Sequence, residues 1–228
     1  MIRFDNSNVT FQKDLLIVGP IKPLGTLQPS GYSVPILYDN RKLQLRFPKS
    51  KLNGIYHNKS FDNYSLLYPN TQDTPEQVQF HKFLQDLQQE ASAQLSDLIV
   101  RESKSNKTLK KMTLNLPINI FSDQGFFLKF PHKNNALRCT KCFNFKGQSQ
   151  DILKHCKYGM VGNYVLLVNI PGFYLNTSYK QNQVYLQMFP DTIIANTKLQ
   201  QIEPINPKDI LGNDLESSSS SESDSESE

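Results

Sequence analysis

The stretch SVPILYDNRKLQLRF, residues 33–47, decides the fold class. Its two halves, Ser33–Tyr38 and Lys42–Phe47, are rich in aliphatic and aromatic residues and read as β-strands. Asp39-Asn40 lies between them, and both residue types tolerate the backbone conformation of a tight hairpin turn. The sequence therefore predicts an antiparallel hairpin here.

Four further segments have the same strand-like pattern. They are Met112–Phe121, Gly125–Phe130, Asn163–Ile170 and Val184–Phe189. The residues Ser122-Asp123-Gln124 separate the first two, which predicts a turn between neighbouring strands.

A single long helix interrupts these strands. Thr74-Pro75-Glu76-Gln77 has the residue types of a capping box with proline in the first turn. The apolar residues that follow recur at steps of three and four and end near Arg101. They are Phe80, Leu84, Leu87, Ala91, Leu95 and Leu98. We expect a mainly β fold, a small barrel with a helical insertion at about residues 74–101.

Charge divides the chain into a basic body and an acidic tail. Seven of the 21 acids follow Lys208, so residues 1–208 carry 14 acids against 25 bases, a net charge of +11. Residues 208–228 are dominated by Ser, Glu and Asp and have little to bury, so we expect a disordered tail. The predicted domain therefore spans residues 1–207.

Several functional classes lack their signatures. The chain has no glycine-rich phosphate loop, no G-x-S-x-G and no H-E-x-x-H, so we do not expect an enzyme. Its apolar runs are far shorter than the roughly 20 residues that span a bilayer. Charged residues interrupt the N-terminal stretch, which argues against a secretory signal. We expect an intracellular protein that does not enter a membrane.

Basic residues interleaved with aromatic ones are the strongest positive signal. Strand alternation in 41–51 places Leu43, Leu45 and Phe47 on one face, with Lys42 and Arg46 on the other. The same alternation in 125–133 leaves Phe127 and Lys129 on one face. An outward ring beside a lysine suits a single-stranded nucleic acid, because bases stack on rings while lysines contact phosphates. The alternative is a second core face along which lysine stems lie.

A basic segment links the predicted helix to the next strand. Lys104, Lys107, Lys110 and Lys111 lie in it. It is either a solvated loop or a set of phosphate contacts, and the second reading gains weight from the basic body, since phosphate contact releases counterions.

The cysteines leave two alternatives open. Cys139 and Cys142 have the spacing of a zinc knuckle, and Cys156 follows His155. These four residues could bind zinc, with His132 as another candidate ligand. Alternatively, the cysteines are reduced thiols.

The chain resembles the single-stranded-DNA-binding proteins of large nucleocytoplasmic DNA viruses, which are similar to those of short-tailed phages. The resemblance rests on Tyr32–Tyr38 running into Leu43–Pro48, and on a closing block that contains Asp151–Cys156, Tyr164–Ile170, Phe173–Leu175 and Val184–Met188. It implies an OB-fold barrel with a helical insertion and an acidic tail. It also implies a role in DNA replication, recombination or repair, in a host nucleus or a cytoplasmic viral replication site.

We therefore expect a protein that binds single-stranded DNA without sequence preference, regulated by its tail, which could also dock replication proteins. The expected phosphate contacts are Arg41, Lys42, Arg46, Lys49, Lys51, Lys107, Lys110, Lys111, Lys129 and Lys133. The expected stacking residues are Phe127, Phe47 and Tyr38, of which the last two are also candidates for the core. The second hypothesis is a zinc-knuckle or interaction protein, such as a transcription or virion factor, whose basic face binds protein.

Overall fold

The computed structural model describes most of the body of the chain. The described residues are 1–4, 9–25, 31–60, 62–106, 109, 125–133, 136–137, 140–176 and 183–199. The chain divides into two compact units, Met1–Lys198 and Leu199–Glu228, and the fold below is that of the first. The predicted strand Met112–Phe121, the turn after it and the predicted tail lie outside the described residues.

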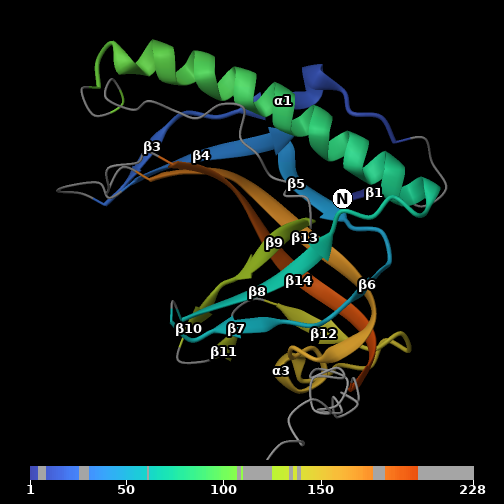
Figure 1. Ribbon diagram of the computed structural model, residues 1–228. Helices are drawn as coiled ribbons and strands as arrows, with labels where there is room; N and C mark the ends of the chain where they lie inside the picture. The colour runs from blue at the N-terminus through green and yellow to red at the C-terminus, as the bar shows by residue number, and fades with distance from the viewer. Residues whose placement is uncertain are drawn as a thin grey trace, which may run out of the picture. The chain divides into compact units, whose positions relative to one another are not determined.

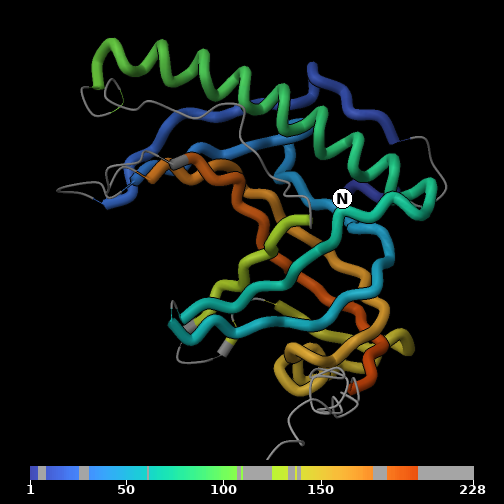
Figure 2. The backbone as a smooth tube through the Cα atoms, viewed as in Figure 1, coloured from blue at the N-terminus to red at the C-terminus, as the bar shows by residue number. Residues whose placement is uncertain are grey.

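The chain order of the elements can be followed in Figures 1 and 2. They are β1 (Ile2–Arg3), η1 (Lys13–Leu15), β2 (Leu16–Val18), β3 (Lys22–Leu24), β4 (Gly31–Tyr38), β5 (Arg41–Arg46), β6 (Ser50–Leu52), β7 (Tyr56–Asn58), β8 (Asn63–Pro69), α1 (Pro75–Ser103), β9 (Gly125–Phe130), β10 (His132–Lys133), β11 (Ala136–Leu137), β12 (Lys141–Phe143), α3 (Ile152–His155), β13 (Met160–Asn176) and β14 (Gln183–Leu199).

The predicted hairpin is present. β4 and β5 pair antiparallel, with Leu37 opposite Lys42 and Tyr38 opposite Arg41. Asp39 and Asn40 have φ values of 52° and 56°. Positive φ at both central positions is what a type I′ hairpin turn requires.

β13 joins this hairpin to the rest of the main sheet, whose strand order is β1-β5-β4-β13-β14-β12. Along its length β13 pairs in turn with β6, β5 and β4. The change of partner falls where Ile170 lies opposite Leu43 and Gly172 lies opposite Pro35. One strand of 17 residues thus contacts three others that are distant in sequence.

The predicted helix is confirmed as α1. The Thr74 side chain accepts a hydrogen bond from the Gln77 backbone N–H, and the Gln77 side chain accepts one from that of Thr74, which completes the capping box. All six apolar residues of the predicted stripe are buried. No helix of the described residues is both long enough and apolar enough to cross a membrane.

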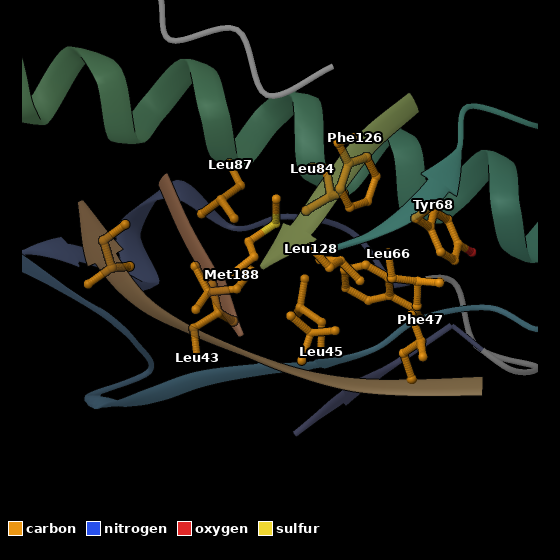
Figure 3. Close-up of a cluster of buried hydrophobic side chains, with 14 of the residues drawn as sticks. Leu43, Leu45, Phe47, Leu66, Tyr68, Leu84, Leu87, Phe126, Leu128 and Met188 are labelled. Carbon is orange, nitrogen blue, oxygen red and sulfur yellow. The ribbon is translucent and has the colours of Figure 1, made fainter. Parts of the chain in front are cut away.

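A smaller sheet of three strands, in the order β7-β8-β9, lies in a separate layer (Figure 1). Its inner face meets the main sheet and α1 in the core, where Phe47 contacts Tyr68, Phe80 and Phe126 with ring centroids 5.1, 4.5 and 5.7 Å apart. Figure 3 shows how Leu43 and Leu45 of β5, and Phe47 just after it, face Leu66 and Leu128 of the smaller sheet.

The mainly β fold with one long helix is confirmed, but the expected barrel closure is not found among the described strands. β9 pairs with β8, and no described pairing joins β9 to β14. The reason is that β7, β8 and β9 form their own sheet and meet the main sheet face to face, through side chains rather than through a continuous hydrogen-bond ladder.

Candidate nucleic-acid interface

A groove of about 360 Å³ lies where β9, β13 and β14 come together. Its described lining residues are mostly aromatic or apolar and include one lysine and no acid. They are Phe126, Phe127, Lys129, Tyr174, Val184, Tyr185, Leu186, Gln187, Met188 and Phe189. A concave apolar surface with one positive charge is suited to an anionic ligand that also presents flat apolar rings.

Strand alternation places the key side chains of β9. Phe126, Leu128 and Phe130 are buried, so Phe127 and Lys129 project from the opposite face. The exposed fraction of Phe127 is 58%. The predicted outward orientation of Phe127 and Lys129 is therefore confirmed.

One tyrosine of the groove contacts Lys129, and a second tyrosine stacks on the first. The Lys129 Nζ atom lies 5.3 Å from the centroid of the Tyr185 ring, a distance at which a cation is attracted to the face of the ring. The Tyr185 ring in turn stacks on Tyr174, with centroids 6.5 Å apart and an interplanar angle of 17°. The ammonium group is thus held on β14, within the groove that Phe127 also lines.

Tyr174 and Tyr185 were not among the predicted site residues. The signal for Tyr185 was present, because Tyr185, Gln187 and Phe189 alternate with Val184, Leu186 and Met188 in a predicted strand. What the pattern lacked was any indication that this face of β14 lies beside β9.

The other predicted basic residues lie elsewhere on the molecule. Arg41 and Lys42 are exposed at the start of β5 and line a separate cavity with Met1 and Leu15. Arg46 is half-buried and, with the exposed Lys49, lines another cavity with Phe4 and Glu76. The exposed Lys51 pairs with β13 through Asn163. The structure therefore does not bring these five residues into the groove of Phe127 and Lys129.

The two predicted stacking residues of the hairpin have different outcomes, and the prediction for Phe47 is wrong. Phe47 is completely buried, and its ring is packed among other rings of the core. Tyr38 is half-buried against Phe11 and Phe83, and its hydroxyl accepts a hydrogen bond from the Gln12 backbone N–H at 2.9 Å. The Phe47 ring is unavailable to a base because α1, β8 and β9 cover it. Tyr38 lines the same cavity as Arg41 and Lys42, so its stacking role stays a prediction.

Several predictions fall on residues whose placement is not described. Lys107, Lys110, Lys111 and Cys139 lie outside the described residues. Lys133 belongs to β10, but its side chain is not described.

A second group of exposed aromatic side chains lies at the far end of the smaller sheet. Tyr56 and Tyr158 meet edge to face with centroids 5.7 Å apart, and their exposed fractions are 49% and 61%. Backbone contacts hold the two segments together, since the Tyr158 N–H donates to the Ile55 carbonyl. This pair was not predicted, because Tyr56 and Tyr158 are 102 residues apart and only Tyr158 is near a predicted element.

The two described cysteines form a buried pair. The Sγ atoms of Cys142 and Cys156 lie 3.6 Å apart. The contact with Cys142, together with burial, raises the pKa of the Cys156 thiol, which keeps it protonated at neutral pH. Among the described residues, no group of three or more His, Cys, Asp or Glu side chains is placed to hold a metal ion. With Cys139 outside the described part of the chain, zinc binding by Cys139, Cys142, His155 and Cys156 stays a prediction.

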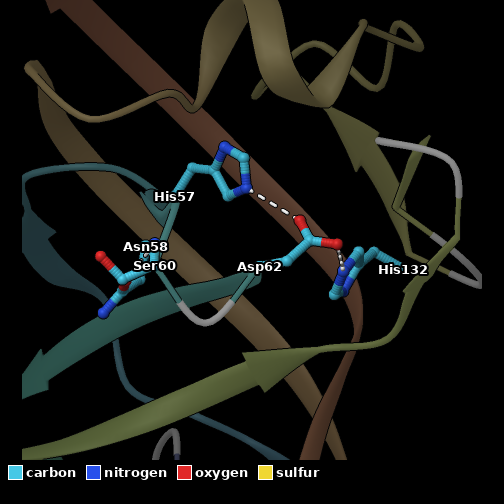
Figure 4. Close-up of polar contacts among 5 residues, drawn as sticks. All are labelled: His57, Asn58, Ser60, Asp62 and His132. Atoms are coloured by element: carbon cyan, nitrogen blue, oxygen red, sulfur yellow. Dashed lines mark hydrogen bonds and ion pairs between the residues drawn. The ribbon is translucent and has the colours of Figure 1, made fainter.

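A polar cluster closes the β7–β8 turn (Figure 4). The Asp62 carboxylate bridges the Nε2 atoms of His57 and His132 at 3.2 and 3.4 Å. A hydrogen bond from His57, and to a smaller extent one from His132, lowers the pKa of Asp62. His57 also stacks on Tyr64, with centroids 4.1 Å apart. The cluster therefore links the β7–β8 turn to β10.

Comparison with known proteins gives no relative from which a role could be transferred. No protein-family model matches the chain, and no curated protein matches it either.

Proposed function

We propose that the body of this protein binds single-stranded DNA without sequence preference, in the groove between β9 and β14. The observation that carries the proposal is the exposed Phe127 ring beside Lys129 in a groove whose described lining has no acid. A base that is free of a duplex can stack on such a ring whatever its identity, and the phosphate beside it can accept a hydrogen bond from the lysine.

The charge of the body supports the same function. Residues 1–208 carry a net charge of +11, and binding a polyanion to such a surface releases counterions. The affinity should therefore fall as the salt concentration rises. The proposed binding would serve DNA replication, recombination or repair, because these processes expose single strands.

Replacement of Phe127 tests the groove directly. Loss of a stacked base should weaken binding by about 1–3 kcal/mol, which is about 5- to 150-fold in dissociation constant. We expect this loss for Phe127→Ala in fluorescence anisotropy with labelled oligo-dT. We expect Phe127→Tyr to bind as the unmodified protein does, because it keeps a ring of the same shape.

The matched control is Val100→Ala on α1, which also truncates an exposed apolar side chain but one that is not among the residues lining the groove. It should leave affinity unchanged. Equal affinity of Phe127→Ala and the unmodified protein would overturn the proposal. Duplex binding as tight as single-strand binding would instead favour a protein whose basic face serves other partners.

The acidic tail is proposed to regulate this binding. Residues 209–228 carry seven acids and no base, so they compete with phosphates for the basic body. A chain ending at Pro207 should bind oligo-dT severalfold more tightly than the full-length chain at low salt. The difference should shrink at high salt, because ions screen the attraction between tail and body. Equal affinities at low salt would exclude this role and leave the tail as a docking segment for replication proteins.

A further inference from the structure

The three-stranded sheet offers a route by which a single strand could continue beyond the groove. Strand pairing places Tyr56 of β7 opposite Ser65 of β8, and Ser65 opposite Lys129 of β9. Residues opposite one another in a sheet share a face, so these three side chains form one row across the three strands. Phe127 lies on the same face of β9, two residues from Lys129.

This row lies on the outer face of the sheet. The alternating residues of β8, Tyr64, Leu66 and Tyr68, are buried in the core, whereas Ser65 is half-buried and Tyr56 and Lys129 are exposed. Adjacent strands are about 4.8 Å apart, so the row covers roughly 10 Å between the backbones of β9 and β7. It ends at the edge-to-face contact between Tyr56 and Tyr158.

The chemistry along the row repeats that of the groove. The row ends at Lys129 on β9, with the exposed Phe127 ring two residues along that strand, and at the exposed Tyr56–Tyr158 pair on the other side. The hydroxyl of Ser65 lies between these ends. Lys157, next to Tyr158, is exposed as well. Asp62 lies at the turn of this sheet, but its carboxylate is engaged by His57, which alternation places on the opposite face of β7 from Tyr56.

We infer that single-stranded DNA leaving the groove crosses the outer face of β9, β8 and β7 and stacks a further base on the Tyr56–Tyr158 pair. This inference rests on the proposed function of the groove. It assigns the pair a role that the groove alone does not require, namely the extension of the binding site to longer strands.

The test compares two lengths of oligo-dT on the full-length chain, about 4 and about 16 nucleotides, which are the limits of the site sizes of single-strand-binding domains. The double variant Tyr56→Ala/Tyr158→Ala should bind the longer strand at least about 5-fold more weakly than the unmodified protein and the shorter strand equally well. The variant Tyr56→Phe/Tyr158→Phe keeps both rings and should bind both lengths as the unmodified protein does. Phe127→Ala should weaken binding of both lengths.

The failure of each idea has its own signature. If Phe127→Ala weakens both lengths while Tyr56→Ala/Tyr158→Ala changes neither, the extended route is wrong and the groove stands. If Phe127→Ala changes neither length, the proposed function itself fails. Both tyrosines are exposed, so their loss should leave the folded structure intact, which urea denaturation of the double variant would verify.

Discussion

Phe47→Ala should lower the free energy of unfolding by about 3–5 kcal/mol, the largest loss we expect from a single truncation in this protein. The Phe47 side chain is completely buried and contacts rings from β8, α1 and β9. Its removal leaves a cavity where the main sheet, the smaller sheet and the helix meet. Urea denaturation followed by circular dichroism measures the loss, provided that the slope of the transition stays unchanged.

The same variant separates a core role from a DNA contact. If Phe47 acts only in the core, the folded fraction of Phe47→Ala should bind oligo-dT with the affinity of the unmodified protein. Phe127→Ala should show the opposite behaviour, with normal stability and weaker binding, because the Phe127 ring is exposed. A Phe47→Ala protein of normal stability and impaired binding would contradict the structure and restore the sequence-based assignment of this ring to stacking.

Elements defined by local patterns were predicted well. The strand Gly125–Phe130 has the predicted bounds, and α1 begins at the predicted cap and extends two residues past Arg101. The strand follows from an alternation of period two, the start of the helix from its capping box, and the β4–β5 hairpin from its turn pair. Each of these signals lies within a few neighbouring residues. Such signals need no knowledge of which segments meet in space.

The residues that share one face of a strand were easier to predict than the role of that face, in the core or in ligand binding. Alternation grouped Phe47 with Leu43 and Leu45, and all three are buried. Alternation says which residues share a face, whereas the covering layer decides whether that face binds a ligand or forms the core. Here the covering layer includes β8, which was not predicted although Tyr64, Leu66 and Tyr68 alternate in it.

The assembly of the candidate site could not be predicted, because it depends on contacts between distant segments. Lys129 contacts Tyr185, which is 56 residues further along the chain, and Tyr56 contacts Tyr158, which is 102 residues further along. Conversely, Arg41, Lys42 and Lys49 are basic and near aromatics in sequence, yet they line cavities away from β9. The interleaved basic and aromatic residues led to the proposed class of ligand. Where such a ligand would bind depends on which strands pair with one another.

Gly172→Ala should lower the free energy of unfolding by about 3 kcal/mol or more, for two reasons that add. The φ of Gly172 is +145°, in a region that other residues adopt only at a cost of about 1–3 kcal/mol. In addition, a Cβ atom here would stand 2.0 Å from the backbone carbonyl oxygen of Val34, so β13 and β4 would have to separate where they pair. Backbone atoms of paired strands cannot move apart without weakening the ladder between them.

Gly159→Ala is the matched control for this substitution. Gly159 also has a positive φ, of +89°, but a Cβ atom there meets nothing within 4 Å. Its replacement should therefore cost only the conformational part, about 1–2 kcal/mol. The two variants compared by urea denaturation isolate the effect of the contact with Val34, and equal losses would show that β13 does not approach β4 as closely as the structure has it. Tyr174 lies two residues beyond Gly172, and its ring stacks on Tyr185 in the groove. The folded fraction of Gly172→Ala should therefore also bind oligo-dT more weakly than the unmodified protein.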